Sequence, residues 1–423
     1  MTPQDPPGET HSVARLSRDA GAVIVGGAHG SLAVARSLGR HGIPVWFATH
    51  DHPITKYSRY VERSFSWGGP DHERAADWLV ELAVRNGLDG WVLFAGGDSE
   101  VRLIAQHHAA LAKAYRVASP AWPVARIAYD KRATYEHAAT VGVATPASFY
   151  PRSRDEAAAL ARKFPVILKP TVNEGRNAFT IAKAWRANDR AALMARHSEA
   201  AALVGADFIV MQEFIPGGGE AQFSYAAVWS DGKPVASLVA RRTRQFPVDF
   251  GFTSTFVETV NVPAVEEAAC RFLEALYYDG LVEIEFKYDT RDNRYKLLDF
   301  NPRPWTWIAL GAAAGVDFPL IQWQIAHGAS VPVRHGRSGV GWCHASRDFV
   351  AACQHIARGA LAPTGDVASL RRLVFAAFAV DDPLPGIVDL PVVLGRVLSR
   401  RYPILAPRGS GVARPKRCAP LLP

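Results

Sequence analysis

Glu285, Asp299 and Asn301 have the side-chain types and the spacing of a cation site. In the expected hairpin, Glu285 lies directly opposite Asp299, and Asn301 follows two residues further along the same face. Carboxylates opposed across a strand pair repel each other unless a divalent cation lies between them. Proteins usually hold Mg²⁺ with one or two carboxylates and substrate phosphates. The pattern therefore predicts a Mg²⁺–nucleotide site, although an amphipathic hairpin with solvated carboxylates shows the same alternation.

Two short strands and a polar turn must position these groups. Leu281–Tyr288 alternates apolar and charged residues with a period of two, which is typical of a half-buried strand. Asp289–Arg294 is rich in turn formers, and Tyr295–Phe300 returns as the second strand. The expected register pairs Asp289 with Tyr295. Glu283, on the same face, is expected to support the site rather than bind the cation.

Other segments supply what a Mg²⁺–nucleotide site needs besides metal ligands. Lys131 and Lys169 stand at the ends of predicted elements, where their side chains can reach phosphates. Thr171–Ala178 is a polar, glycine-containing loop that can cover a site and exclude water. Met211–Ile215 offers strand backbone and apolar walls for a purine, and Glu220 can accept ribose hydroxyls. Each feature has an ordinary structural explanation, so their order along the chain carries the hypothesis.

The first part of the chain predicts a doubly wound α/β domain. Ala22–Gly27 and Ile43–Ala48 have the composition of buried parallel strands, and a helix over Ser31–His41 joins them. The glycines from Gly26 to Gly30 precede that helix, where backbone N–H groups can receive an anion. Their spacing is not the dinucleotide fingerprint, so a domain without a cofactor is favoured over a dinucleotide-dependent oxidoreductase.

A further strand of this domain, Trp91–Ala95, is followed by Asp98 and Glu100. The carboxyl ends of strands in an open α/β sheet form a ligand crevice, so both acids are candidates to face a ligand there. Capping of the following helix by Asp98 or Ser99 is an equally good explanation.

The order of motifs resembles the ATP-grasp superfamily, over roughly residues 20–330. The matching pieces are DK at 130–131, PVILKP at 165–170, the glycine loop at 173–178, MQEFIPGGGE at 211–220, VEIEF at 282–286 and LLDFNPRP at 297–304. Asp299 stands where the family more often has glutamate, which is a mild departure because aspartate also ligates Mg²⁺.

The resemblance implies ATP and Mg²⁺ as cofactors, with Mn²⁺ as a substitute. The implied ATP-binding residues are Lys131 and Lys169 on the phosphates, Gln212, Glu213 and Ile215 at the adenine, and Glu220 at the ribose. Glu285, Asp299 and Asn301 would hold the metal, and Arg303 would stabilise the transferring phosphoryl group or the acyl phosphate.

The implied activity is an ATP-dependent carbon–nitrogen ligase. A carboxylate attacks the γ-phosphorus, and an amine then attacks the acyl phosphate; no covalent protein nucleophile is needed. Small-molecule carboxylates and amines, such as an amino acid or a cell-surface precursor, are the expected substrates, and many relatives are homodimers. A catalytically silent ATP-binding regulator is the alternative.

A basic segment, 240–247, lies between the expected adenine-binding strand and the metal hairpin and is the candidate for binding the acid. Arginine suits bidentate carboxylate binding. On a regular strand, Arg242 and Arg244 face one way and Arg241 the other, and at least one of Arg241 and Arg244 is expected to contact the acid. A solvated basic edge strand is the alternative. Gly251–Ser254 is a candidate companion loop.

The expected fold class is α/β, with an α+β ATP-grasp part. A disordered tail (1–20), a doubly wound domain (21–126), a two-lobed ATP-grasp domain (127–330, with its lid lobe at about 128–212) and a C-terminal extension (331–423) follow one another. Within the lid lobe, Phe179–Ala184 is expected to be a strand.

Bulk properties exclude several function classes. The net charge is +8, but from residue 400 onward six residues are basic and none is acidic, which leaves about +2 for the body. A nucleic-acid-binding body is therefore not expected. Four scattered cysteines favour a reducing, cytoplasmic setting. Cys343-His344 and Cys353-x-His355 match no common zinc finger. No apolar run approaches the ~20 residues of a membrane span.

Overall fold

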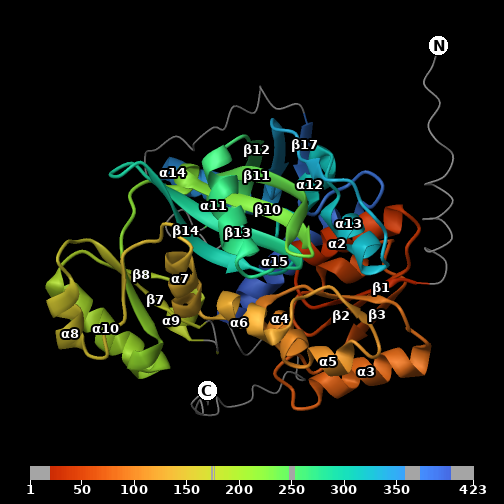
Figure 1. Ribbon diagram of the computed structural model, residues 1–423, viewed down its shortest axis with the longest axis horizontal. Coiled ribbons are helices and arrows are strands. Elements are labelled where there is room, and N and C mark those ends of the chain that lie inside the picture. The colour runs from red at the N-terminus through yellow and green to blue at the C-terminus, as the bar shows by residue number, and fades with distance from the viewer. Residues whose placement is uncertain (1–19, 173–174, 176, 247–252, 358–371, 402–423) are drawn as a thin grey trace.

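The computed structural model describes residues 20–172, 175, 177–246, 253–357 and 372–401. The predicted N-terminal tail and most of the basic C-terminal tail lie outside these residues. The described chain forms a five-stranded, an eight-stranded and a four-stranded sheet (Figure 1). The predicted α/β class is confirmed.

The N-terminal sheet is parallel, in the order β3-β2-β1-β4-β5. Alternate residues of its central strands enter two separate cores, because side chains on a strand point to opposite faces. Ile24 packs in the same cluster as Val34 of α2, whereas Val25 packs with Leu79 of α3. Helices therefore cover both faces, and the doubly wound prediction is confirmed. The elements are β1 (Ala22–Val25), α2 (His29–Arg40), β2 (Val45–Thr49), η1 (Ile54–Tyr57), β3 (Arg63–Ser66), α3 (Ala75–Asn86), β4 (Val92–Ala95), α4 (Asp98–Gln106), α5 (His108–Leu111) and β5 (Arg116–Val117).

The four-stranded sheet, in the order β6-β9-β7-β8, is the core of a separate lobe, at the left of Figure 1. α10 packs against α8 and against three of the strands. Two connecting helices, α6 (Trp122–Tyr129) and α7 (Lys131–Thr140), lead into this lobe. Its elements are β6 (Ser148–Phe149), α8 (Arg154–Leu160), β7 (Val166–Pro170), α9 (Ala178–Ala182), β8 (Trp185–Ala187), α10 (Arg190–Val204), η2 (Ala206–Phe208) and β9 (Ile209–Glu213).

The strand predicted over Phe179–Ala184 is wrong. Residues 178–182 form the short helix α9 because Asn177 and Thr180 make a capping box. The Asn177 side chain accepts hydrogen bonds from the N–H groups of Phe179 and Thr180, and the Thr180 hydroxyl accepts one from the Asn177 N–H. Such reciprocal bonds satisfy the donors that a helix N-terminus leaves open, so a local signal outweighed the β-branched composition.

The eight-stranded sheet follows the order β14-β13-β10-β11-β12-β16-β17, with β15 paired to β11. Asp231 and Gly232 both have positive φ in the turn between β10 and β11, as a tight hairpin requires. α11 covers one face with Val265 and Phe272, and α12 and α13 pack toward the N-terminal domain. The elements are η3 (Gly219–Ala221), β10 (Gln222–Ser230), β11 (Lys233–Phe246), β12 (Thr253–Val260), α11 (Pro263–Glu274), β13 (Gly280–Asp289), β14 (Arg294–Asn301), α12 (Ala309–Ala314), α13 (Phe318–Ala326) and β15 (Arg334–His335).

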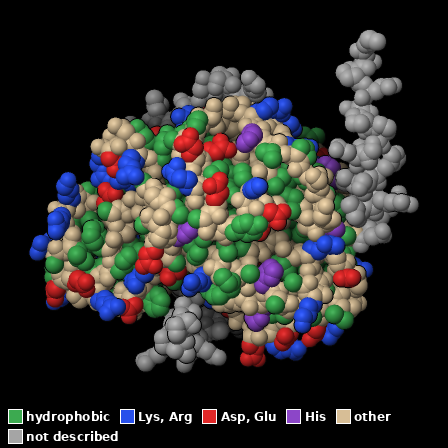
Figure 2. Space-filling view, viewed as in Figure 1, with side chains coloured by type: hydrophobic (Ala, Val, Ile, Leu, Met, Phe, Trp, Pro, Cys, Tyr) green, Lys and Arg blue, Asp and Glu red, His purple; other side chains and the backbone are tan. Residues whose placement is uncertain are grey.

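The C-terminal extension adds to this sheet and also reaches back to the N-terminal domain. β16 (Val340–Cys343) and β17 (Arg372–Phe375) extend the sheet beyond β12, while α14 (Ala345–Ala357) contacts β11 and β12. α15 (Leu384–Arg401) packs on η1 of the first domain. None of the described helices is both long and apolar enough to cross a bilayer. On the face in Figure 2, basic and acidic side chains are interspersed.

Arg36 and Asp382 anchor the extension to α2. The Arg36 guanidinium is buried and donates to Asp382 Oδ2 at 2.9 Å and to the Ala377 carbonyl at 2.7 Å. Asp382 also accepts from the Ser58 hydroxyl at 2.7 Å and from the Arg59 N–H at 2.9 Å. The carboxylate is thus the hub between three segments.

Asp382→Ala is expected to lower the free energy of unfolding by about 3 kcal/mol, because it leaves a buried guanidinium without its carboxylate. The adjacent Asp381→Ala is the matched control. Asp381 pairs with Arg40 at 2.7 Å, but both side chains are 42% exposed, so its loss should cost about 1 kcal/mol or less. Urea unfolding measures both values, and equal losses would contradict the buried-hub interpretation.

Candidate active site

A cavity of about 250 Å³ lies between the eight-stranded sheet, the end of β7 in the small lobe and α4 of the N-terminal domain. It is lined by the end of β7, by strands β10, β11, β12, β13 and β14, and by α4, α6 and the start of α7. The structure brings together there the following residues that the sequence singled out: Asp98, Lys131, Lys169, Glu283, Glu285, Asp299, Asn301 and Arg303.

A β-bulge places the two metal-candidate carboxylates opposite each other. At the turn the register pairs Asp289 with Arg294, so the predicted Asp289–Tyr295 pairing is wrong by one residue. The register shifts between Glu285 and Phe286, and beyond the shift Glu285 pairs with Asp299, as expected. A bulge adds one residue to one strand of the pair, and this extra residue brings Glu285 and Asp299 opposite each other. The correct pairing therefore depends on an irregularity that strand alternation does not reveal.

Lys131 neutralises Asp299 in this structure. It is the first residue of α7, whose N-cap Asp130 accepts from the Arg132 N–H, and the cap aims the lysine into the cavity. Lys131 Nζ lies 2.8 Å from Asp299 Oδ1. Burial alone would lower the pKa of Lys131 and raise that of Asp299, but their mutual attraction outweighs it, so the Lys131 pKa is raised and the Asp299 pKa is lowered. Both groups are charged at neutral pH.

Glu283 lies behind the metal-candidate groups and organises them. It is buried and accepts from the Ser224 hydroxyl at 3.0 Å and from Trp307 Nε1 at 3.1 Å. The Asn301 amide points its Nδ2 at Glu283 Oε2, 3.4 Å away. Burial, reinforced by the charge of Glu285, raises the pKa of Glu283 to about 7. These contacts fit the supporting role expected for Glu283.

Lys169 ends β7 and faces the same cavity from the smaller lobe. Burial, helped by the positive charge of Lys131, lowers its pKa to about 8. An anion bound in the cavity would offset both effects and favour the charged ammonium. Lys169 is therefore suited to hold a phosphate or a carboxylate.

Arg303 links the sheet to the N-terminal domain across the cavity. Its guanidinium forms an ion pair with Asp98 at the start of α4, and Nη2 lies 3.4 Å from Asn301 Oδ1. Burial opposes the charge of Arg303, but Asp98 outweighs it and raises the arginine pKa. Asp98 thus faces the cavity, which is one of the two roles that the sequence suggested for it, the other being a helix cap.

The structure does not bring Arg241 or Arg244 into the cavity. Arg241 Nε donates to Glu258 at 2.9 Å, and Arg244 donates to Asp348 at 2.8 and 2.6 Å. The strand is irregular between Arg242 and Arg244, so these two do not share a face as regular alternation would require. Arg242 lines the cavity instead, with Nη2 3.2 Å from Glu285 Oε2.

The four residues expected at a purine nucleoside lie beside the cavity, outside its lining. β9 pairs with β7, where Val210 lies opposite Lys169. Gln212 is fully buried and donates to the Ser148 hydroxyl at 2.8 Å, and Ile215 is buried as well. Glu220 accepts from the Gly218 N–H at 2.8 Å.

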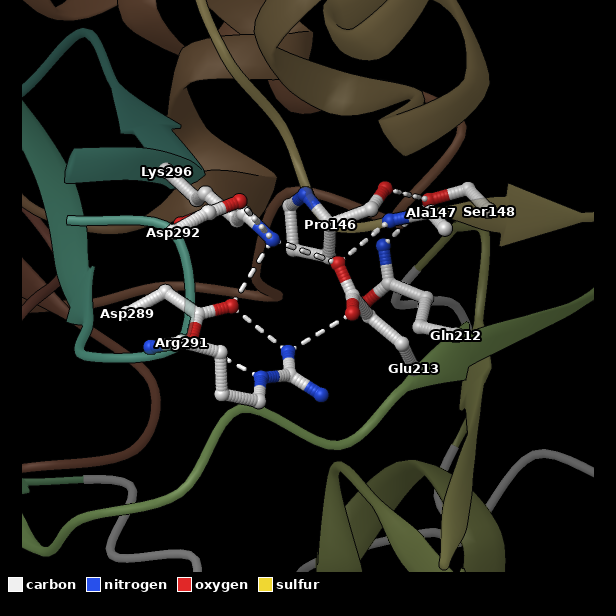
Figure 3. A network of polar contacts seen from close by, with 9 residues as sticks. All are labelled: Pro146, Ala147, Ser148, Gln212, Glu213, Asp289, Arg291, Asp292 and Lys296. Atoms are coloured by element: carbon white, nitrogen blue, oxygen red, sulfur yellow. Dashed lines mark hydrogen bonds and ion pairs between the residues drawn. The ribbon is translucent and has the colours of Figure 1, made fainter. Parts of the chain in front are cut away.

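Glu213 belongs to a network that ties the small lobe to the β13–β14 turn (Figure 3). Its carboxylate accepts from Arg291 at 2.7 Å and from Lys296 at 2.8 Å. Both cations also contact the buried Asp289, at 2.6 and 2.8 Å. The side chain of Glu213 therefore holds the small lobe to the β13–β14 turn, and its backbone N–H donates to the Ala147 carbonyl at 3.0 Å.

Asp289→Asn is expected to lower the free energy of unfolding by about 2 kcal/mol near pH 7, since charge-assisted hydrogen bonds are lost. The hydrogen bond from Arg291 holds the pKa of Asp289 well below its usual range. A depressed native pKa contributes stability above the unfolded pKa of ~3.9, and this is lost as the pH falls further. Urea unfolding at pH 7 and pH 3 should show a smaller difference between variant and wild type at pH 3. Asp292→Asn, a half-exposed neighbour, is the control, and a pH-independent difference would contradict the prediction.

The glycine turn after β1 is filled by protein. Glu100 is buried, and a Cβ on Gly26 would lie 2.3 Å from its carboxylate oxygen. A Cβ on Gly27 would lie 2.4 Å from the Gly96 carbonyl oxygen. Burial raises the pKa of Glu100 to about 7. Close packing of two turns explains these glycines, and an acidic side chain stands where a dinucleotide pyrophosphate would need positive groups.

Lys183 is a cavity residue that the sequence did not indicate. It adopts a left-handed conformation (φ 59°) at the end of α9 and lines the cavity. The wrong strand prediction over 179–184 concealed this position. The expected cover loop, Thr171–Ala178, lies partly outside the described residues. Half of Gly251–Ser254 also lies outside them, although Ser254 itself lines the cavity.

The donor set suits a hard divalent cation. Glu285 and Asp299 offer carboxylate oxygens on adjacent strands, and the Asn301 amide is oriented by its contacts with Glu283 and Arg303. Lys131 and Arg242 now contact the two carboxylates, so a cation would compete with both. Oxygen-only ligation with room for phosphate oxygens is the chemistry of Mg²⁺ sites.

Comparison with known proteins places this site in a wider group. Residues 130–334 match the family described as "Carbamoyl-phosphate synthase L chain, ATP binding domain". No curated protein matches the sequence. The biotin carboxylase domain of 2-oxoglutarate carboxylase from Hydrogenobacter thermophilus is similar, with a TM-score of 0.60 at 16% identity, over 75% of this chain and 73% of that one.

Two ligases or synthetases have similar structures as well. The L-amino acid ligase from Bacillus licheniformis has a TM-score of 0.55 at 16% identity, over 74% of this chain and 75% of that one. The ADP complex of N5-carboxyaminoimidazole ribonucleotide synthetase has a TM-score of 0.57 at 14% identity, over 76% and 78%. At such identities the likeness shows a shared fold.

Proposed function

We propose a function on the premise that this chain belongs to the ATP-grasp superfamily, whose fold it has and whose ATP-binding domain it matches over residues 130–334. The proposed activity is an ATP- and Mg²⁺-dependent ligase that joins a carboxylate to an amine through an acyl phosphate. The observation that carries it is one cavity holding opposed Glu285 and Asp299 together with cationic side chains that include Lys131, Lys169, Arg242 and Arg303.

ATP and Mg²⁺ are the cofactors, as the sequence predicts. The matched family is described as an ATP binding domain, and the Hydrogenobacter thermophilus structure was solved with MgADP and ADP. Bound Mg²⁺ supplies positive charge to the phosphates during transfer. Glu285, Asp299 and Asn301 are the proposed residues that hold it.

The ATP-binding assignments combine the cavity with the strand beside it. Lys131 and Lys169 bind phosphates, because both line the cavity, one from the start of α7 and the other from the end of β7. Gln212 and Glu213 at the end of β9 and Ile215 just after it border the adenine, and Glu220 binds the ribose. The ion pairs of Glu213 keep that strand beside Lys169.

The reaction has two balanced steps. A carboxylate oxygen of the acid attacks the γ-phosphorus of ATP, the bond to the β-phosphate oxygen breaks, and ADP leaves. The amine nitrogen then attacks the carbonyl carbon of the acyl phosphate, inorganic phosphate leaves, and the nitrogen loses a proton. Arg303 is placed to stabilise charge on the transferring group, since positioning and charge neutralisation dominate phosphoryl transfer.

An amino acid or a similarly small acid is the proposed substrate class. Arg242, rather than Arg241 or Arg244, is the proposed contact for its carboxylate, because only Arg242 of the three lines the cavity. The cavity of about 250 Å³ admits small molecules. The likeness to an L-amino acid ligase supports this class.

Two other functions predict different observations. A silent ATP-binding regulator needs no opposed carboxylates beside several cationic side chains, yet both are present in one cavity. A dinucleotide-dependent oxidoreductase is disfavoured by Glu100, whose carboxylate fills the glycine turn. The ligase therefore explains the most observations.

A screen for ADP release tests the proposal. Purified protein with Mg²⁺ and ATP is supplied with pairs of amino acids and amines, and the expected result is ADP formation that requires both partners. Tight Mg²⁺–ATP binding without turnover across a broad screen would favour the regulator. Thermal stabilisation by NAD(P)H and not by Mg²⁺–ATP would overturn ATP-dependent function altogether.

A further inference from the structure

Two histidines and an aspartate from distant parts of the chain meet in the interior, away from the cavity. They are His29 at the start of α2, His344 after β16 and Asp389 in α15. The metal-ligating atoms of the three side chains lie within 4.8 Å of one another. Exposure is 2% for His29, 1% for His344 and 4% for Asp389, so all three are shielded from solvent.

Contacts within this cluster orient the groups toward a common centre. His29 Nε2 lies 2.9 Å from Asp389 Oδ1, and the two imidazole ring centroids are 4.3 Å apart. The Ser346 hydroxyl donates to Asp389 Oδ2 at 2.8 Å and lies 3.2 Å from His344 Nδ1. Hydrogen bonds of this kind to the remote atoms of ligand side chains are typical of metal sites, where they fix the orientation of the ligands.

One polar atom of the cluster is unsatisfied. His344 Nε2 is buried and has no hydrogen-bond partner in the part of the chain that the structure describes. A buried polar atom without a partner costs about 1–3 kcal/mol, so it calls for an explanation. Nδ1 of the same ring is already engaged by Ser346, which leaves Nε2 as the atom for a ligand bond.

We propose that His29, His344 and Asp389 bind a divalent transition-metal ion, with Zn²⁺ as the best match. Two imidazole nitrogens and a carboxylate oxygen are ordinary zinc ligands, whereas Mg²⁺ prefers oxygen alone. Zinc bonds of about 2.0–2.2 Å require the three atoms to draw together by roughly 1 Å. Small side-chain rotations achieve this because the groups already converge.

The proposed ion fastens the C-terminal extension to the N-terminal domain. Asp389 belongs to α15, which packs on η1, and His344 follows β16, which lies between β12 and the edge strand β17 of the large sheet. Gly30, the residue after His29 in α2, lies against the backbone of Pro304 and Trp305, and Trp305 lines the cavity. The ion therefore has a structural role next to the ligase cavity, and it is independent of the proposed function because none of its ligands lines that cavity.

Cysteine is not part of the proposed ligand set. Among the described residues, the group whose ligating atoms converge contains no cysteine, and Cys353 is exposed. Of the two sequence segments Cys343-His344 and Cys353-x-His355, only His344 belongs to the proposed ligand set.

Metal analysis of the full-length protein, prepared without a polyhistidine tag, tests the proposal. Chelator-treated protein is titrated with Zn²⁺ against a chromogenic chelator, without nucleotide. The expected result is one tight site per chain and a higher melting temperature with Zn²⁺. His344→Gln and Asp389→Asn should weaken binding at least 100-fold. The control is His327→Gln, a half-buried histidine bonded to the Trp323 and Gly90 carbonyls.

Substitution with Co²⁺ keeps the test decisive if a variant fails to fold. The wild-type protein should give the visible spectrum of four-coordinate cobalt without a thiolate-to-metal band. Absence of a tight Zn²⁺ site would overturn the proposal. So would Zn²⁺ binding that is unchanged in folded His344→Gln, or a thiolate band that points to cysteine.

Discussion

Asp299→Asn is expected to lower the rate of ATP-dependent ADP formation about 1,000-fold or more. The amide keeps the shape of the side chain but removes the charge that faces Lys131 and, in the proposed complex, the metal ion. Positioning and neutralisation of the phosphates are nearly the whole of catalysis in phosphoryl transfer, so losing a metal ligand removes several kcal/mol of transition-state stabilisation. Glu285→Gln should behave alike, since Glu285 pairs directly with Asp299.

Two measurements separate this effect from a folding defect. Calorimetric titration with ATP, with and without Mg²⁺, should show that the Mg²⁺-dependent part of the affinity is lost in Asp299→Asn. Asp292→Asn is the matched control, because it makes the same change in the same hairpin outside the cavity. An Asp299→Asn protein that retains both turnover and Mg²⁺ dependence would refute the metal assignment.

The sequence was sufficient to locate this pair because strand alternation and motif order are local signals. Glu285 and Asp299 face each other as expected, and Lys131 and Lys169 reach the same cavity. The turn register was wrong by one residue, and the bulge between Glu285 and Phe286 compensated. The correct prediction that Glu285 pairs with Asp299 therefore depends partly on a bulge, whose position is seen only in the structure of the two strands.

The same kind of irregularity explains the residues that the sequence misplaced. Alternation along β11 could not anticipate the shift between Arg242 and Arg244, which sends Arg244 to Asp348 and leaves Arg242 in the cavity. The partner Asp348 lies 104 positions away in the chain, in an extension whose docking has no local signature.

The sequence also could not reveal residues that meet only because distant segments of the chain pack together. His29 and Asp389 are separated by 360 positions, and neither has a metal-binding spacing in its own segment. Their meeting depends on α15 packing against the N-terminal domain, which the buried Arg36–Asp382 pair reinforces. A cluster of this kind becomes visible only once the tertiary structure has placed the extension.

Arg303→Ala is expected to reduce kcat about 100- to 1,000-fold while changing the affinity for ATP less than about 10-fold. The guanidinium enters the cavity beside Asn301 and is held by Asp98, and that ion pair keeps it charged and in place. Removing one preorganised donor for developing charge typically costs 10²–10³ in kcat. Loss of an interaction made mainly in the transition state lowers kcat without a matching change in ground-state binding.

Arg303→Lys separates charge from geometry at this position. Lysine keeps the positive charge but lacks the planar fork that binds two oxygens, so an intermediate loss of about 10- to 100-fold is expected. Arg271→Lys, on the exposed face of α11, is the control and should leave kcat unchanged. Steady-state ADP formation and calorimetric ATP binding on the same preparations measure both quantities. If Arg303→Ala weakens ATP binding as much as it lowers kcat, Arg303 acts in ground-state nucleotide binding. Only a larger effect on kcat than on ATP affinity identifies stabilisation of the transferring phosphoryl group.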